Sequence, residues 1–200
     1  MNQSSDLHGS APDDSPVALL IIDMINDLEF PDAEKIEQPA IEAAKCIASL
    51  KTRAKEAGVA VIYCNDNFGR WRSDFREVVD RVCNDGVRGE PLARLLEPDH
   101  DDYFVLKPKH SAFFETTLET LLRHLGAKRL ILTGITGDIC LLITASDAYM
   151  RDYEIHVPAD CTASVLAEDT EHALDYMARV LKANICTSGE LDFAALQKSD

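Results

Sequence analysis

Apolar and polar positions follow two alternating periods along the chain, and this pattern predicts strands and helices in turn. Val17–Ile22 is an unbroken apolar run, which is typical of a strand covered on both faces. Further strands are predicted at Val59–Cys64, Tyr103–Leu106, Arg129–Leu132, Glu154–Pro158 and Asn184–Thr187. Six strands alternating with helices favour one α/β domain, an open parallel sheet with helices on both faces.

Apolar residues at steps of three and four predict the intervening helices. One helix is expected to begin with Pro39 in its first turn and to end at Gly58. Another should open with a Thr116-x-x-Glu119 capping box and end before Gly126. Helices are also predicted at Ile139–Arg151 and Glu168–Ala183, and the segment 65–98 is expected to be a long excursion over the sheet edge.

The length and composition suit one domain with its own core. Of 200 residues, 46 % are hydrophobic. The segment Met1–Pro16 has no apolar centre and no Lys or Arg, so we expect residues 1–16 to be a disordered tail and 17–200 to form the domain. The tail also lacks the features of a secretory signal, which predicts a cytoplasmic protein.

Charge and cysteine content exclude several classes of partner. The formal net charge is −15, which disfavours nucleic acids and anionic membrane surfaces. The longest apolar run, Val17–Ile25, contains Asp23 and is far shorter than the roughly 20 residues of a membrane span. The six cysteines have no spacing suited to a closed zinc site, and we interpret them as reduced thiols.

Three polar residues follow strands of the predicted sheet, and each could carry chemistry. Asp23 follows the first strand, Lys107 follows Tyr103–Leu106, and Cys140 follows Arg129–Leu132 through a glycine turn. Ligands of open α/β sheets bind at the carboxyl ends of the strands. A helix N-terminus and a lysine should lower the pKa of the cysteine, while the aspartate takes its proton.

Each of these residues also has a plain structural explanation. A lone cysteine early in a buried helix usually serves packing, an aspartate after a strand is often a turn residue, and a lysine is most simply a solvated charge. The coincidence of three complementary types at three strand ends is what favours a catalytic site.

Several stretches of the sequence resemble the isochorismatase-like cysteine hydrolases. They span nearly the whole chain and comprise Leu19–Asp27 (LLIIDMIND), Leu106–Phe114 (LKPKHSAFF), Leu132–Cys140 (LTGITGDIC), Thr144–Tyr149 (TASDAY) and Asp160–Ser164 (DCTAS). The resemblance implies a parallel sheet, homo-oligomers and a catalytic triad of Asp23, Lys107 and Cys140. It also implies a cis peptide at Ile135–Thr136, with the Thr136 and Cys140 N–H groups forming an oxyanion hole.

The chain departs from this family's pattern at several positions. Asn26 stands where a glutamine is frequent, and Gly137 where a threonine is frequent. Nicotinamidases carry an Asp-x-His metal motif after the second strand, whereas this chain reads Asp66-Asn67-Phe68, so we predict no metal and no cofactor. Isochorismatases that hydrolyse a vinyl ether lack the nucleophilic cysteine, and Cys140 therefore argues against that reaction.

Loop residues after the second strand are candidates for substrate binding. We expect Phe68, Arg70, Trp71, Asn26 and Phe113 to line the crevice, with Arg70 and Arg72 able to hold a substrate carboxylate. The alternatives are that these arginines pair with neighbouring acids on a solvated helix, and that Trp71 and Phe113 simply belong to the core. Asp99-His100-Asp101-Asp102 could suggest a cation site, although a solvated turn fits this segment better.

The sequence thus predicts a metal-independent cysteine hydrolase. Its expected reaction is cleavage of the C–N bond of a small amide, ureide or carbamoyl compound through a thioester. Two alternatives stay open: a partner-binding protein of the same fold without catalysis, and a hydrolase of another bond such as an ester or an isochorismate-type ether.

Overall fold

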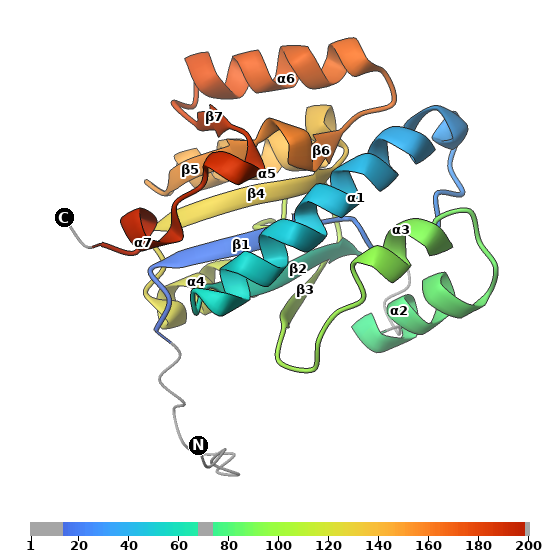
Figure 1. Cartoon of the computed structure of the whole chain (residues 1–200), viewed down its shortest axis with the longest axis horizontal. Helices are drawn as coiled ribbons and strands as arrows, with labels where there is room; N and C mark the ends of the chain where they lie inside the picture. Colours follow the sequence, from blue (N-terminus) through green and yellow to red (C-terminus); the bar gives the residue numbers. More distant parts are fainter. Residues whose placement is uncertain (1–13, 68–73, 199–200) are drawn as a thin grey trace.

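A parallel sheet forms the centre of the protein. The computed structural model describes residues 14–67 and 74–198. Its strands are β1 (Val17–Ile22), β2 (Ala60–Asp66), β3 (Tyr103–Lys107), β4 (Arg129–Ile135), β5 (Glu154–Pro158), β6 (Thr162–Ala163) and β7 (Asn184–Cys186). The order across the sheet is β3-β2-β1-β4-β5-β7, with β6 paired to β4 (Figure 1).

The prediction of a parallel α/β sheet is confirmed, but the sheet has seven strands rather than six. The additional strand, β6, lies between β5 and α6, where no strand was predicted. Its two residues pair with Gly134 and Ile135, and the Thr162 hydroxyl donates to the Gly134 carbonyl over 2.8 Å. Two residues leave no detectable period in the sequence, so only the pairing with β4 reveals this strand.

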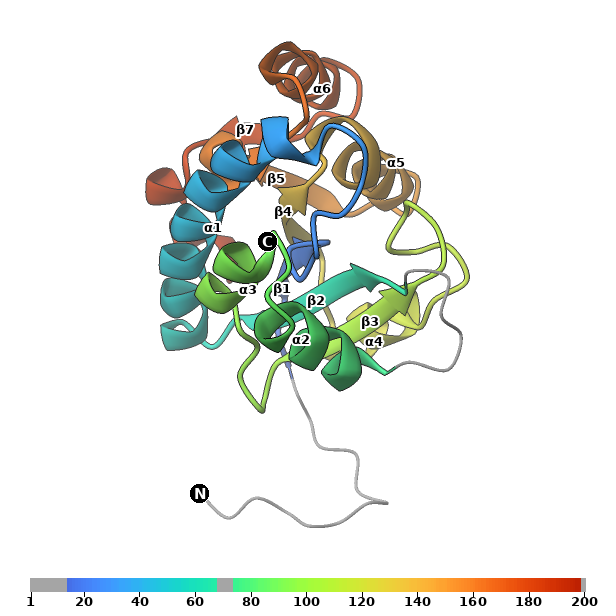
Figure 2. The same cartoon turned by 90° about the vertical axis from the view of Figure 1, so that its right-hand side faces the viewer.

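Helices cover both faces of the sheet (Figure 2). The α-helices are α1 (Ala33–Glu56), α2 (Phe75–Asn84), α3 (Glu90–Leu95), α4 (Leu118–Leu125), α5 (Leu142–Tyr149), α6 (Ala167–Arg179) and α7 (Phe193–Leu196). Single turns are η1 (Gly137–Leu141), η2 (Ala159–Cys161) and η3 (Ser188–Glu190). None of the described helices is long and apolar enough to cross a bilayer.

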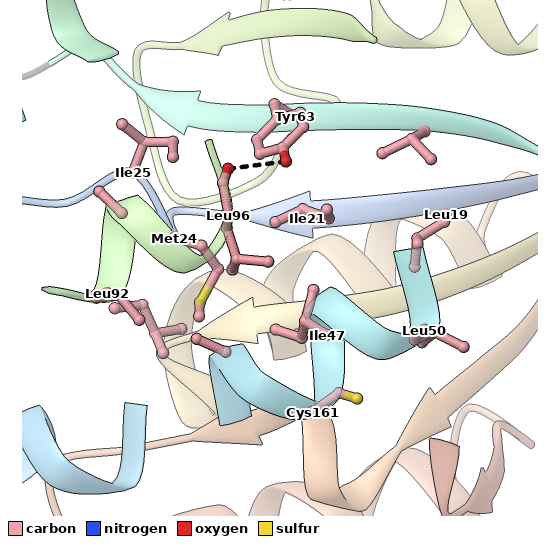
Figure 3. Close-up of a cluster of buried hydrophobic side chains, with 14 of the residues drawn as sticks. Leu19, Ile21, Met24, Ile25, Ile47, Leu50, Tyr63, Leu92, Leu96 and Cys161 are labelled. Carbon is pink, nitrogen blue, oxygen red and sulfur yellow. Dashed lines mark hydrogen bonds between the residues drawn. The ribbon is translucent and has the colours of Figure 1, made fainter. Parts of the chain in front are cut away.

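Alternate residues of β1 enter two separate cores. Leu19 and Ile21 pack with Ile47 of α1, whereas Leu20 and Ile22 face the side of the sheet that α4, α5 and α6 cover. Figure 3 shows the first of these cores, where the Tyr63 hydroxyl donates to the Leu96 carbonyl over 2.9 Å. Every residue of β1 is fully buried, which explains its unbroken apolar run.

The predicted starts of α1 and α4 are wrong. Helix α1 begins at Ala33, one turn and a half before its expected start, so Pro39 lies inside the helix. Ala33 and Ile36 are fully buried and extend the apolar stripe of α1, and this packing outweighs the hydrogen bond that proline removes. Helix α4 begins at Leu118 without the expected capping box, because the Thr116 hydroxyl accepts from the Leu118 N–H instead.

The chain order reverses between β1 and β4, and this reversal positions the site. From β1 the chain proceeds outward through β2 and β3, and it then returns to β4 on the other side of β1. The register pairs Ile22 with both Cys64 and Gly134, and Asp66 with Lys107. The carboxyl ends of all four strands therefore meet at the place where such sheets bind ligands.

Candidate active site

Asp23 occupies a fixed position directly after β1. Its backbone adopts a left-handed conformation (φ 51°), and its N–H donates to the Cys64 carbonyl over 3.0 Å. One carboxylate oxygen, Oδ1, accepts from the Asp66 N–H at 2.7 Å, and the other, Oδ2, lies 2.7 Å from the Lys107 Nζ. Both oxygens are thus held, and the side chain is almost completely buried.

Lys107 links the aspartate to the cysteine. Its side chain, at the end of β3, has no exposed surface, and its Nζ lies 3.6 Å from the Cys140 Sγ. The same ammonium donates to the Lys109 carbonyl over 3.2 Å and lies 4.0 Å from Asp66 Oδ2. A buried ammonium with these partners holds its geometry without solvent competition.

The turn between β4 and α5 presents Cys140. Gly134 has a φ of 118°, and a Cβ there would lie 2.0 Å from the Ile22 carbonyl oxygen, so only glycine fits beside β1. The expected cis peptide at Ile135–Thr136 is present. Beyond it, η1 is one π-helical turn in place of the expected start of an α-helix.

This π-helical turn changes which N–H groups are used. The Thr136 carbonyl accepts from the Ile139 N–H at 3.3 Å and from the Leu141 N–H at 3.1 Å, and no bond from the intervening Cys140 N–H to that carbonyl is formed. Single π turns inside helices are frequent at functional sites. The predicted role of the Cys140 N–H in an oxyanion hole stays a prediction.

Burial is the largest single influence on the pKa of each of the three side chains. It raises the pKa of the Cys140 thiol to about 12, with the Asp23 charge adding to the effect and Lys107 opposing it. Burial also raises the pKa of Asp23, which Lys107 lowers only in part. Burial lowers the pKa of Lys107, but the charges of Asp23 and Cys140 outweigh it, so the net shift is upward.

The prediction that the thiol has a lowered pKa is therefore wrong. Removing the sulfur from water destabilises the thiolate more than one neighbouring ammonium stabilises it. With its pKa raised to about 12, the thiol forms a thiolate only by transferring its proton to a neighbouring base.

A cavity of about 560 Å³ opens onto these groups. Its described lining combines polar residues from the strand ends with an apolar wall, and consists of Asp23, Asn26, Asp27, Glu29, Phe30, Asp66, His110, Ile135, Thr136, Asp138, Ile139, Cys140 and Val165. A cavity of this size suits a small molecule. Lys107 has no exposed surface and does not line the cavity, but it contacts Asp23 and Cys140, which do.

Comparison with known proteins decides the family. A family model described as the isochorismatase domain matches residues 17–190. The chain belongs to the isochorismatase family. The uncharacterized isochorismatase family protein YaaI of Bacillus subtilis (strain 168) is 44 % identical over 174 residues, which cover 87 % of this chain and 95 % of that protein.

Solved structures of the family share the fold. An isochorismatase family protein from Desulfovibrio vulgaris matches with a TM-score of 0.72 and 26 % identity, covering 91 % of this chain and 99 % of that one. N-carbamoylsarcosine amidase from Thermoplasma acidophilum matches with a TM-score of 0.64 and 28 % identity, covering 88 % of this chain and 98 % of that one. The chain is thus a hydrolase of a family that has amidases among its members.

The other residues predicted to bind substrate have mixed outcomes. Asn26 lines the cavity, and its side chain accepts from the Leu28 N–H at 2.8 Å. Phe113 does not line the cavity; it is buried in the core with its ring 4.8 Å from the Arg151 guanidinium. Phe68, Arg70 and Trp71 lie outside the described residues, so their predicted roles stay predictions.

Several residues of the cavity were missed in the sequence. The His110 Nδ1 lies 3.7 Å from the Cys140 Sγ, and Glu29, Phe30 and Val165 form parts of the wall. His110 lies three residues after Lys107 in the segment Leu106–Phe114, so its place beside a strand end could have indicated a role in the site. The other three come from loops with no distinctive pattern.

The residues of this chain do not fit the metal site of nicotinamidases. Where the Asp-x-His motif would lie, the sequence reads Asp66-Asn67-Phe68, so a phenylalanine takes the place of the histidine. Asp66 also lies 4.0 Å from the Lys107 Nζ. Within residues 14–67 and 74–198, Asp99, Asp101 and Asp102 are the only carboxylates close enough together to suggest a cation site. Two lysines already neutralise that cluster, with Lys51 2.6 Å from Asp102 and Lys55 2.7 Å from Asp101.

Proposed function

We propose that this chain is a metal-independent cysteine hydrolase that cleaves the C–N bond of a small amide, ureide or carbamoyl compound through a thioester on Cys140. The observation that carries the proposal is the contact of Lys107 Nζ with both the Asp23 carboxylate, at 2.7 Å, and the Cys140 sulfur, at 3.6 Å, two groups that line one cavity. An acid–base pair beside a nucleophile is the arrangement that acyl transfer requires.

The first half of the reaction forms the thioester. Asp23 accepts the thiol proton as the Cys140 sulfur attacks the substrate carbonyl carbon, and the carbonyl π electrons move to oxygen. The N–H groups of Thr136 and Cys140 donate to that oxyanion. When the intermediate collapses, the C–N bond breaks, its electrons stay on nitrogen, and Asp23 returns the proton to the leaving amine.

The second half releases the acyl group. Asp23 takes a proton from water as the water oxygen attacks the thioester carbon. The C–S bond then breaks, the sulfur regains a proton from Asp23, and a carboxylic or carbamic acid departs. The raised pKa of Asp23 supports this role, because it reduces the difference between the pKa of Asp23 and the thiol pKa of about 12 and so favours proton transfer between them.

The experiment is a screen of small primary amides, ureides and carbamoyl compounds with intact-protein mass spectrometry. We expect an acyl adduct on the wild-type chain that is absent in Cys140→Ala and still present in Cys186→Ala. Cys186 is a matched control because it is also a partly buried free thiol.

Each other outcome of the screen selects an alternative. Turnover of esters with no turnover of any amide would support a hydrolase of another bond. No adduct and no turnover over the whole panel would contradict the proposal and favour a partner-binding protein.

A further inference from the structure

The cavity above Cys140 is bordered by acidic side chains. Among the residues that the structure describes, its lining includes Asp23, Asp27, Glu29, Asp66 and Asp138, and it includes neither lysine nor arginine. The charge of this lining bears directly on which substrate the site accepts, because a cavity wall focuses the field of its charges on the ligand.

Cationic side chains of the described ranges lie within ion-pair distance of three of these five carboxylates. Lys107 lies 2.7 Å from Asp23 and 4.0 Å from Asp66. Asp27 is 3.4 Å from the Arg81 guanidinium. In the described part of the chain, neither Glu29 nor Asp138 has an ion-pair partner.

Asp138 occupies the wall next to the nucleophile. Its N–H donates to the Ser164 hydroxyl at 3.2 Å, which anchors the residue in η1 two positions before Cys140. Its Oδ1 and the Thr136 hydroxyl oxygen are both buried without a hydrogen-bond partner among the described residues. Two unpaired polar oxygens on one wall suit a ligand that brings N–H donors.

The remaining wall is apolar. Phe30, Ile135, Ile139 and Val165 line it, and no described residue of this wall can neutralise an anion. A substrate carboxylate placed here would lose its hydration without gaining a cationic partner, which is costly. An apolar group would meet no such penalty, and a positively charged group would offset its own loss of hydration against the carboxylates of the lining.

We propose, on the basis of the function proposed above, that this site selects amides without a negative charge and favours a cationic or N–H-rich group facing Asp138. The net charge of the whole chain, −15, acts in the same direction at long range. The opposite selectivity would follow if Arg70 or Arg72, which lie outside the described residues, held a substrate carboxylate.

The first experiment reads the charge preference at Cys140 without relying on turnover. Cys140 is labelled with methanethiosulfonates that carry an aminoethyl, a methyl or a sulfonatoethyl group, and each rate is divided by that of free 2-mercaptoethanol. We expect the cationic reagent to exceed the anionic one by roughly three- to tenfold, as for unit charges several ångströms apart near a protein surface. Peptide mapping separates Cys140 from the other thiols.

Variants assign this preference to the wall. In Asp138→Asn the cation-to-anion ratio should fall by about threefold, and in Asp85→Asn, which removes an equal charge from an exposed side chain outside the cavity, it should not change. An equal response of both variants would show that only net charge matters and would overturn the assignment to Asp138.

The second experiment compares turnover of three matched primary amides: 3-aminopropanamide, butanamide and succinamate. We expect kcat/KM to decrease in that order and the first value to drop in Asp138→Asn. If no amide is hydrolysed while the labelling preference holds, the proposed function fails and the charge preference stands. A preference for the anionic reagent or for succinamate, abolished in Arg70→Ala, would overturn this inference.

Discussion

Replacing Lys107 with methionine tests the ion pair at the centre of the site. The side chain of Lys107 has no exposed surface, and its partner Asp23 is 5 % exposed. Methionine keeps most of the length of the side chain and removes the charge. Asp23 then keeps the hydrogen bond from the Asp66 N–H but loses the ammonium 2.7 Å away.

The expected cost follows from this burial. Removing one partner of a buried ion pair destabilises a protein by about 3–5 kcal/mol, a large part of the roughly 5–15 kcal/mol that stabilises a domain. The double variant Asp23→Asn/Lys107→Met no longer buries an unpaired carboxylate, so it should recover most of that loss. Neither variant should hydrolyse amides, because the acid–base pair is missing in both.

The stability deficit of Lys107→Met should depend on pH, and its direction follows from the pKa of Asp23. Burial already raises the pKa of Asp23, and loss of Lys107 raises it further, because that ammonium opposes the shift. A carboxyl group with a raised pKa stabilises the folded state below its unfolded pKa, and this stability is lost as the pH rises through the folded pKa. The deficit of Lys107→Met should therefore be small near pH 4 and grow toward pH 8.

The assay is urea unfolding followed by circular dichroism at pH 4, 6 and 8 for the wild type, both single variants and the double variant. Two results would refute the reasoning: a Lys107→Met protein as stable as the wild type at pH 8, or a double variant no more stable than Lys107→Met. Either would mean that the Asp23 carboxylate is not held ionised by Lys107.

Three further variants probe the surroundings of this pair. Asp23→Asn should abolish amide turnover. It should also lower the pKa of the Cys140 thiol below about 12, because the Asp23 charge contributes to that raised pKa. Iodoacetamide should then label Cys140 faster at pH 9, and slower labelling would contradict this reasoning. His110→Ala should lower kcat/KM by only about two- to tenfold, the effect of one lost hydrogen bond, and a loss above a hundredfold would transfer the proton role to His110. Gly89→Ala places a Cβ 1.7 Å from the Asn26 carbonyl oxygen, so thermal unfolding should show a lower Tm and KM should rise, whereas an unchanged Tm would disprove the close approach.

The sheet and the meeting of Asp23 and Lys107 were predictable from the sequence. Their strands are short apolar runs with clear polar ends, and the carboxyl ends of parallel strands lie along one edge. The glycines just before Cys140 also indicated a tight turn, although they did not show that the turn is π-helical. The hydrophobic pattern was sufficient to place a residue where the backbone of its strand alone fixes that place.

Local pattern failed where packing overrides it. Pro39 indicated the first turn of a helix, yet the helix starts at Ala33 because Ala33 and Ile36 complete a buried stripe. Phe113 lies in a motif close to Lys107, but its ring packs beside Arg151 rather than in the cavity. The direction in which a side chain points depends on neighbours that are distant in sequence.

The chemical state of Cys140 is a property of the tertiary structure alone. Sequence supplied a thiol, a lysine and a helix start, which by themselves favour a lowered pKa. The folded chain instead partly buries Cys140 close to Lys107 and Asp23, and the lost hydration outweighs the nearby positive charge. The sequence determines which residue types stand at the strand ends. The desolvation of Cys140 and the acidic wall of the cavity depend on atoms that only folding brings together.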